Sequence, residues 1–254
     1  MLRADQLFKF LVSCAAVFML AGTAEAGPPL ICHPFDAGSA AMLPWGPGQG
    51  WNTPDRSYDV QRLTADTLRL LTPATPVLAR MEIMRRATIY ANQDRKVALA
   101  LMKAVLDRTK ATAEGSRDPL PWFDAGYLIE SYRQMKSAGP WGDMLTGVEQ
   151  LSADFRNDPR TVDGYAYVQK ALRLAGSNAE MEFAASLMQQ GEVAAAHRQR
   201  AVAGAPAGSL LAKNLIFFFG HVFINSTIYM SVIAVYEILP TFTRRPWKSS
   251  KPFL

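Results

Sequence analysis

Apolar residues recur three and four positions apart through the middle of the sequence, from Asp59 to about residue 200. Residues at this spacing lie on one face of an α-helix. The residues that carry the pattern are Val77, Met81, Met84 and Ala91, then Val97, Leu101 and Val105, then Leu128, Tyr132 and Met135. Runs of β-branched residues, which favour strands, are scarce in this segment. The middle of the chain therefore predicts an all-α fold.

Helix-breaking residues divide this segment into about six predicted helices joined by short connections. The breakers are Pro73 and Pro76, then Gly115, Pro119 and Pro121, then Gly139 and Pro140, then Gly176. Ser177 and Glu180 have the spacing of a capping box, which predicts a helix start at that point. Short connections favour antiparallel helical hairpins over residues 58–200. A helical-hairpin bundle and a tetratricopeptide-like stack both remain open, because no fixed repeat period aligns through the segment.

Residues 27–57 are rich in proline and glycine and carry neither a helical nor an alternating pattern. We therefore expect a turn-rich lead-in to the helical domain. Gly46, Gly48 and Gly50 are spaced closely enough to suggest a phosphate-binding loop. No predicted strand precedes them and no Lys-Ser/Thr pair follows, so we interpret them as turn glycines.

The first 26 residues have the pattern of a secretory signal peptide. Arg3 and Lys9 precede or open an apolar run, and small residues at 24 and 26 form a cleavage site. We expect the signal peptide to span residues 1–26 and the mature chain to begin at Gly27. The helical domain would then be exported from the cytoplasm.

One cysteine, Cys32, remains after this cleavage, so no disulfide is expected within the mature chain. Cys32 and His33 match the second half of a c-type haem attachment motif, but Pro29 stands where the first cysteine is required. Covalent haem is therefore not expected. The segment from Leu30 to Asp36 is similar to the mature start of uncharacterised exported bacterial proteins. Residues 27–200 resemble such proteins, which implies a class and no activity.

A second apolar stretch lies near the C-terminus, over residues 215–239. As a helix it would be roughly 37 Å long, which exceeds the roughly 30 Å hydrocarbon core of a bilayer. We expect a linker at 201–209, a transmembrane helix at 210–240 and a basic cytoplasmic tail at 241–254, because the lysines and arginines cluster beyond the stretch. A buried core helix is the alternative interpretation.

The C-terminal stretch also has a recognisable motif. Asn-Leu-Ile-Phe-Phe-Phe-Gly-His-Val-Phe-Ile-Asn-Ser-Thr-Ile-Tyr begins at Asn214, and Arg-Pro-Trp-Lys begins at Arg245. Residues 214–253 resemble the region of the sixth transmembrane helix of subunit I of haem-copper oxidases such as cytochrome c oxidase. The resemblance implies that His221 corresponds to a copper ligand, a role that suits a neutral imidazole nitrogen.

This chain departs from the oxidase pattern next to that histidine. Val222 and Asn225 replace the proline and the redox-active tyrosine of many family members. The family's metal sites use histidines from several helices, whereas this chain has three histidines in all. Because one imidazole does not complete a coordination shell, the resemblance implies shared ancestry and not oxidase activity.

Charge and motifs exclude several other functions. The formal charge of +5 is modest and the basic residues are dispersed or lie near the C-terminus, so nucleic acid is not an expected partner. Metalloprotease, nucleophile-elbow and P-loop signatures are missing from the sequence. Asp124 and Glu130 are six residues apart and face different sides of a helix, which argues against a paired acid and base.

We therefore hypothesise a non-enzymatic, exported helical interaction or scaffold domain without a cofactor. Membrane lipid would hold its C-terminal helix, and its main domain would lie on the periplasmic face of a bacterial inner membrane, where another membrane or periplasmic protein would be its partner. The alternative is a fusion or fragment of haem-copper oxidase subunit I, inactive alone. Copper or haem belongs only to that alternative.

Overall fold

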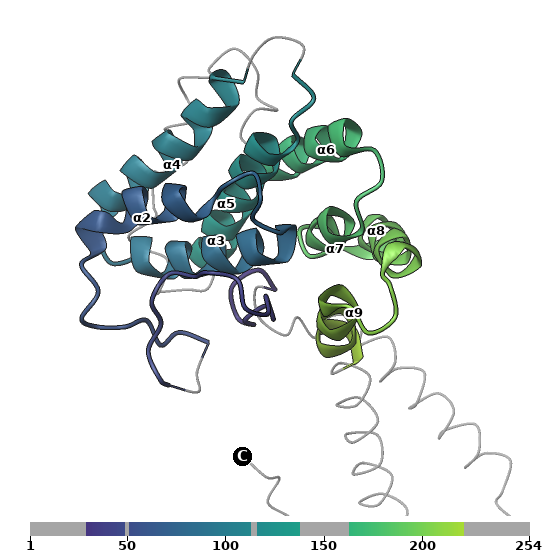
Figure 1. Cartoon of the computed structure of the whole chain (residues 1–254), viewed down its shortest axis with the longest axis horizontal. Helices are drawn as coiled ribbons and strands as arrows, with labels where there is room; N and C mark the ends of the chain where they lie inside the picture. The colour runs from purple at the N-terminus through teal and green to yellow at the C-terminus, as the bar shows by residue number, and fades with distance from the viewer. Residues whose placement is uncertain (1–28, 49–50, 113–115, 138–162, 221–254) are drawn as a thin grey trace, which may run out of the picture. The chain divides into compact units, whose positions relative to one another are not determined.

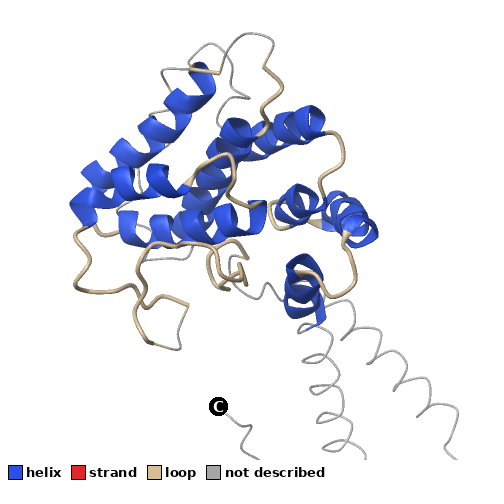
Figure 2. Cartoon of the chain, viewed as in Figure 1, coloured by secondary structure: helices blue, strands red, loops and turns tan. Residues whose placement is uncertain are grey.

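The computed structural model describes residues 29–48, 51–112, 116–137 and 163–220. These residues contain eight α-helices and no strand, which confirms the all-α prediction (Figure 2). The longer helices are α3 (Val77–Ala91), α4 (Arg95–Lys110), α5 (Leu120–Ser137), α6 (Gly164–Ala175) and α8 (Gly191–Gly204). The shorter elements are the 3₁₀ turn η1 (Val60–Arg62), α2 (Leu63–Leu70), α7 (Ala179–Ser186), α9 (Leu210–Leu215) and the π turn η4 (Ile216–Gly220).

Helix α3 lies at the centre of the helical domain. Every residue of α3 except Arg86 is buried. The helix packs against α5, α2, α4 and α7, and the lead-in runs along it (Figure 1). Because α3 is covered on all sides, it has no solvent-facing stripe of polar residues. Its charged residues Arg80, Glu82 and Arg85 are therefore buried as well.

Helix α5 joins the two halves of this domain, because it packs against α3 and α4 on one side and against α6 on the other. The α5–α6 crossing is close enough to require glycine in both helices. A Cβ atom at Gly126 would lie 2.4 Å from the Gly164 carbonyl oxygen, and a Cβ atom at Gly164 would lie 2.5 Å from the Gly126 carbonyl oxygen. Backbone atoms cannot yield as a flexible side chain can, so alanine at either position would force the helices apart.

Of the predicted breakers in the described residues, Pro73, Pro76 and Pro119 lie between helices, and Gly176 ends α6 with a φ of 73°. Pro121 is instead the second residue of α5, in the first turn, where proline is tolerated. The predicted capping box is wrong in detail. Asn178, not Ser177, is the N-cap of α7, and its side chain accepts a hydrogen bond from the Met181 N–H at 2.9 Å. Glu180 instead accepts from the Leu78 N–H at 3.2 Å. It thereby serves the first turn of α3, whose own N-cap is a proline without a side-chain acceptor.

The chain divides into two compact units, one over residues 25–214 and the other over residues 1–24 with 215–254. In the first unit α8 continues to Gly204, which is part of the segment expected as a linker. The first unit ends at Asn214, whose amide oxygen accepts from the Asp36 N–H at 3.0 Å.

The predicted signal peptide, the predicted span beyond residue 220 and its basic tail lie outside the described residues. Among the helices that the structure does describe, none has both the length and the apolar character required to cross a bilayer.

We predict that residues 25–214 fold without the rest of the chain, because this unit contains its own buried core and its own helix caps. The polypeptide is expected to give a helical circular dichroism spectrum and one cooperative thermal transition. A shorter polypeptide that ends at residue 209 would lack the Asn214 contact and should unfold at a lower temperature. A disordered or strand-rich spectrum of residues 25–214 would contradict the prediction.

Candidate functional site

A buried group of charged side chains on α3 holds the lead-in in place. Glu82 forms ion pairs with Arg85, whose Nε lies 2.8 Å from Oε2, and with Arg86, whose Nε lies 2.7 Å from Oε1. The side chains of Glu82 and Arg85 are 2% and 1% exposed. Charges buried this deeply are tolerated only when their remaining hydrogen-bonding groups find partners.

The lead-in backbone supplies those partners. The hydrogen bonds are Phe35 N–H to Glu82 at 3.0 Å, Arg85 to the Ile31 and Trp51 carbonyls at 3.2 and 3.0 Å, and Arg86 to the Leu43 carbonyl at 2.7 Å. An irregular segment has no strand or helix partners for its backbone. The three side chains therefore substitute for the secondary structure that the lead-in lacks.

An aromatic contact at the end of α3 fixes the second half of the lead-in. The Tyr90 hydroxyl accepts from the Asp55 N–H at 3.0 Å and donates to the Pro44 carbonyl at 2.7 Å. The Trp45 ring packs edge-on against Tyr90 and lies 5.0 Å from the Arg85 guanidinium carbon. Two stretches of lead-in, one before and one after residues 46–53, are thus tied to one side chain.

Hydrogen bonds join Gly46 and Gly48 to Thr53 between these two stretches. The Gly46 N–H donates to the Thr53 carbonyl at 3.1 Å, and the Thr53 hydroxyl donates to the Gly48 carbonyl at 3.3 Å. A Cβ atom at Gly46 would lie 2.8 Å from the Thr53 carbonyl oxygen, so the close approach requires glycine there. The interpretation of Gly46 and Gly48 as turn glycines agrees with this geometry.

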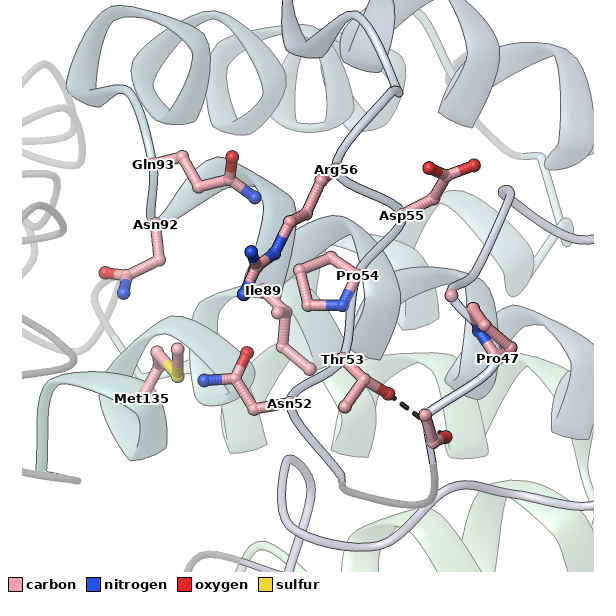
Figure 3. Close-up of a pocket in the computed structure, with 12 residues that line it drawn as sticks. Pro47, Asn52, Thr53, Pro54, Asp55, Arg56, Ile89, Asn92, Gln93 and Met135 are labelled. Carbon is pink, nitrogen blue, oxygen red and sulfur yellow. Dashed lines mark hydrogen bonds between the residues drawn. The ribbon is translucent and has the colours of Figure 1, made fainter.

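An open groove with a volume of about 760 Å³ lies between this part of the lead-in and the end of α3 (Figure 3). We call it the lead-in groove. Its walls are formed by Gly46, Pro47, Gly48, Asn52, Thr53, Pro54, Asp55, Arg56, Ile89, Asn92, Gln93 and Met135. The volume falls within the range of sites that bind small molecules or short chain segments.

Three polar side chains of the groove have no hydrogen-bond or ion-pair partner within the described residues. These are the guanidinium of Arg56 and the amides of Asn52 and Gln93, and all three line the same groove. Figure 3 shows Arg56 extending across the groove towards Ile89, whereas the carboxylate of Asp55 points the other way. The Asp55 carboxylate accepts from the N–H and the hydroxyl of Ser57, which lowers the pKa of Asp55.

The groove has the chemistry of a binding site. Amides and a guanidinium form hydrogen bonds with a ligand, and the prolines with Ile89 and Met135 provide apolar contact. Its lining residues contain one carboxylate, and this carboxylate is already bonded to Ser57. They contain neither histidine, cysteine nor lysine, and the Thr53 hydroxyl donates to the Gly48 carbonyl.

A second polar cluster joins α6, α7 and α8. The Tyr165 hydroxyl lies 2.7 Å from His197 Nε2, His197 Nδ1 contacts the Glu182 carboxylate, and Arg200 Nε lies 2.9 Å from Glu182. Arg200 Nη2 also lies 2.8 Å from His197 Nδ1. None of the four lies in the lead-in groove, and we interpret them as a tie between the three helices.

The remaining residues considered from the sequence are structural where the structure describes them. Asp124 pairs with Arg80 and Arg108, whereas Glu130 pairs with Arg133, so each carboxylate has arginine partners of its own. Burial raises the pKa of both Asp124 and Glu130, although their arginine neighbours oppose the shift.

Cys32 is half-buried, and its burial raises the pKa of the thiol, which disfavours the reactive thiolate. Groups of three or more His, Cys, Asp or Glu side chains placed to bind a metal ion do not occur in the described residues. His221, the copper ligand implied by the oxidase resemblance, lies outside those residues. Its role remains a prediction.

Sequence reasoning missed the lead-in groove. The proline and glycine content predicted turns, but a turn pattern does not say which helix a segment packs against. The only sequence signal was the group Glu82, Arg85 and Arg86, which sits in a helix too apolar to have a solvated face. Charges at such positions need partners from elsewhere in the chain.

Neither a protein family, nor a curated protein, nor a solved structure matches this chain.

We predict that Arg85→Met lowers the free energy of unfolding by about 3–5 kcal/mol, because it leaves Glu82 buried with a single ion-pair partner. Urea denaturation of residues 25–214 measures the change. Arg95→Met is the matched control, since Arg95 is exposed and has no partner in the described residues, and it should change stability by less than about 0.5 kcal/mol. A similar small loss for both variants would show that the ion pair does not hold the fold.

Proposed function

We propose that this protein is a non-enzymatic helical interaction domain, exported across the membrane and tethered there by its C-terminal segment, and that it binds its partner in the lead-in groove. Membrane lipid and another membrane or periplasmic protein are the proposed partners. No cofactor takes part. The domain is proposed to be an irregular helical bundle, because helix pairs beginning at Val77, Leu120 and Ala179 are unevenly spaced.

The groove is the observation that carries the binding role. It is open to solvent, its polar groups Arg56, Asn52 and Gln93 converge without partners, and it is built on a segment fixed by buried ion pairs. A rigid site costs less conformational entropy on binding than a flexible one. Arg56 and Gln93 are exposed and Asn52 is half-buried, so all three side chains are accessible to a ligand in the groove without first breaking a bond to the protein.

The tether is supported by the last described turn, η4. Ile216 is 72% exposed and Phe217 is 47% exposed, and both lie at the start of the apolar stretch of residues 215–239. Large apolar side chains exposed side by side are unfavourable in water. Their position at the start of an apolar stretch long enough to span a bilayer favours burial in lipid.

We predict that the full chain stays with the membrane after an alkaline carbonate wash, whereas a chain that ends at Asn214 is released into the soluble fraction. Burial of the apolar stretch in lipid causes the difference. Removal of residues 241–254 alone is the control, and it should leave the protein in the membrane fraction. Release of the full chain by the wash would contradict the tether.

We predict that a photo-crosslinking amino acid at position 52 yields a discrete adduct with a partner in intact cells, because Asn52 lines the groove. The same amino acid at position 173 is the control, since Arg173 is an exposed residue of α6 outside the groove. Gel mobility and mass spectrometry of the purified adducts give the result. Equal adducts from both positions, or none from position 52, would contradict a binding role for the groove.

A further inference from the structure

We infer that the lead-in groove recognises the C-terminal end of a peptide chain, with Arg56 bound to the terminal carboxylate, the amides of Asn52 and Gln93 bound to the peptide backbone, and an apolar last side chain on the groove floor. This inference rests on the proposed function and adds to it the chemical class of the ligand.

The charge of the groove selects a single carboxylate. Arg56 is a planar guanidinium without an ion-pair partner in the described residues, and its geometry matches the two oxygens of a carboxylate. Asp55 is the other charged residue of the groove wall, and its pKa is lowered, so it stays ionised. A phosphate dianion would need more positive charge than one arginine supplies. A monoanion is therefore the better match.

The amides identify the group that lies next to the carboxylate. A side-chain amide donates through nitrogen and accepts through oxygen, which matches the carbonyl and the N–H of a peptide bond. Asn52 follows Gly46 and Gly48 in the lead-in, and Gln93 lies in the α3–α4 connection; Figure 3 shows the two on either side of Ile89. A chain lying between them would have hydrogen-bonding groups along both of its edges.

The apolar floor of the groove matches an apolar side chain of the ligand. Ile89 and Met135 are buried at 2% and 1% exposure, and Pro54 lies beside them (Figure 3). Methionine adapts its shape to different apolar partners. The volume of about 760 Å³ exceeds what a single carboxylate group needs, so several residues of the chain contribute to binding. A C-terminal residue carries a carboxylate, a peptide bond and a side chain close together. The groove likewise holds a guanidinium, two amides and an apolar floor close together.

The test uses the full-length protein in detergent and N-acetylated tetrapeptides that end in Val, Leu, Met or Phe, each as the free acid and as the C-terminal amide. Ligand-observed NMR selects the tightest acid, and a titration gives its dissociation constant. We expect the free acid to bind at least about tenfold tighter than its amide, because the charge-assisted hydrogen bond to Arg56 is lost on amidation.

Three further samples distinguish a terminal carboxylate bound to Arg56 from a non-specific charge effect and from a side-chain carboxylate. Arg56→Gln should weaken binding of the acid about tenfold and change binding of the amide less than about twofold. Arg173→Gln, the exposed control on α6, should change neither. An amidated tetrapeptide with glutamate at the third position tests a side-chain carboxylate, and we expect it to bind like the other amides.

Three outcomes would each overturn the assignment of a chain terminus. These are equal affinity for acid and amide, unchanged affinity of Arg56→Gln for the acid, and an amidated glutamate peptide that binds as tightly as the free acid. Absence of binding by every tetrapeptide at millimolar concentration would overturn it as well. If the crosslink from position 52 persists in any of these cases, the groove is still an interaction site and only the ligand class is wrong. If that crosslink is also missing, the proposed function fails too.

Discussion

The ion pairs of Glu82 with Arg85 and Arg86 are the interaction on which the rest of the helical domain depends. Burying two such charges costs several kcal/mol unless their hydrogen-bonding groups are satisfied. Here the partners come from the lead-in backbone, which equally lacks partners of its own. The charged side chains of α3 and the lead-in backbone therefore satisfy each other's hydrogen-bonding groups. This reciprocity explains how a segment without a single described helix or strand before Val60 has a defined place against α3.

Helix α3 differs from an amphipathic helix because its polar residues contact protein groups and not water. An amphipathic helix needs one covered face, and its polar face meets water. Helix α3 is covered by four helices and by the lead-in, so its polar residues meet backbone and carboxylates instead. Arg80 repeats the arrangement at the other end of the helix, where it binds Asp124 of α5 and the Thr75 carbonyl of the α2–α3 connection. Buried charge on α3 thus fixes both the connection that enters this helix and the lead-in that runs along it.

The sequence predicts the parts of this fold that depend on neighbouring residues. The periodic apolar pattern and the breakers placed most helices correctly, because helix faces and caps are local properties. Glu180 shows the limit of that reasoning. Its spacing from Ser177 predicts a capping box, yet the carboxylate serves Leu78 in another helix. The contact joins residues 102 positions apart, and no local pattern encodes such a separation.

The candidate site was hidden for the same reason. No motif contains Asn52, Arg56 or Gln93. These residues line one groove because Arg85 on α3 binds the lead-in backbone at Trp51. A polar residue in a turn-rich segment is ordinarily solvated, so its type alone says nothing about binding. The missing information was tertiary: which backbone groups the arginines of α3 would satisfy.

The lead-in is also joined to the end of the compact unit. Asp36 contacts both Lys213 and Asn214 of α9. The Lys213 ion pair is largely exposed and contributes little. Asn214 is 2% exposed, and its amide both accepts from the Asp36 N–H and donates to the Asp36 carbonyl at 2.9 Å. A buried amide bonded at both of its ends fixes position and orientation together. The lead-in, which carries most of the groove, is thus fixed both along α3 and at the end of the compact unit.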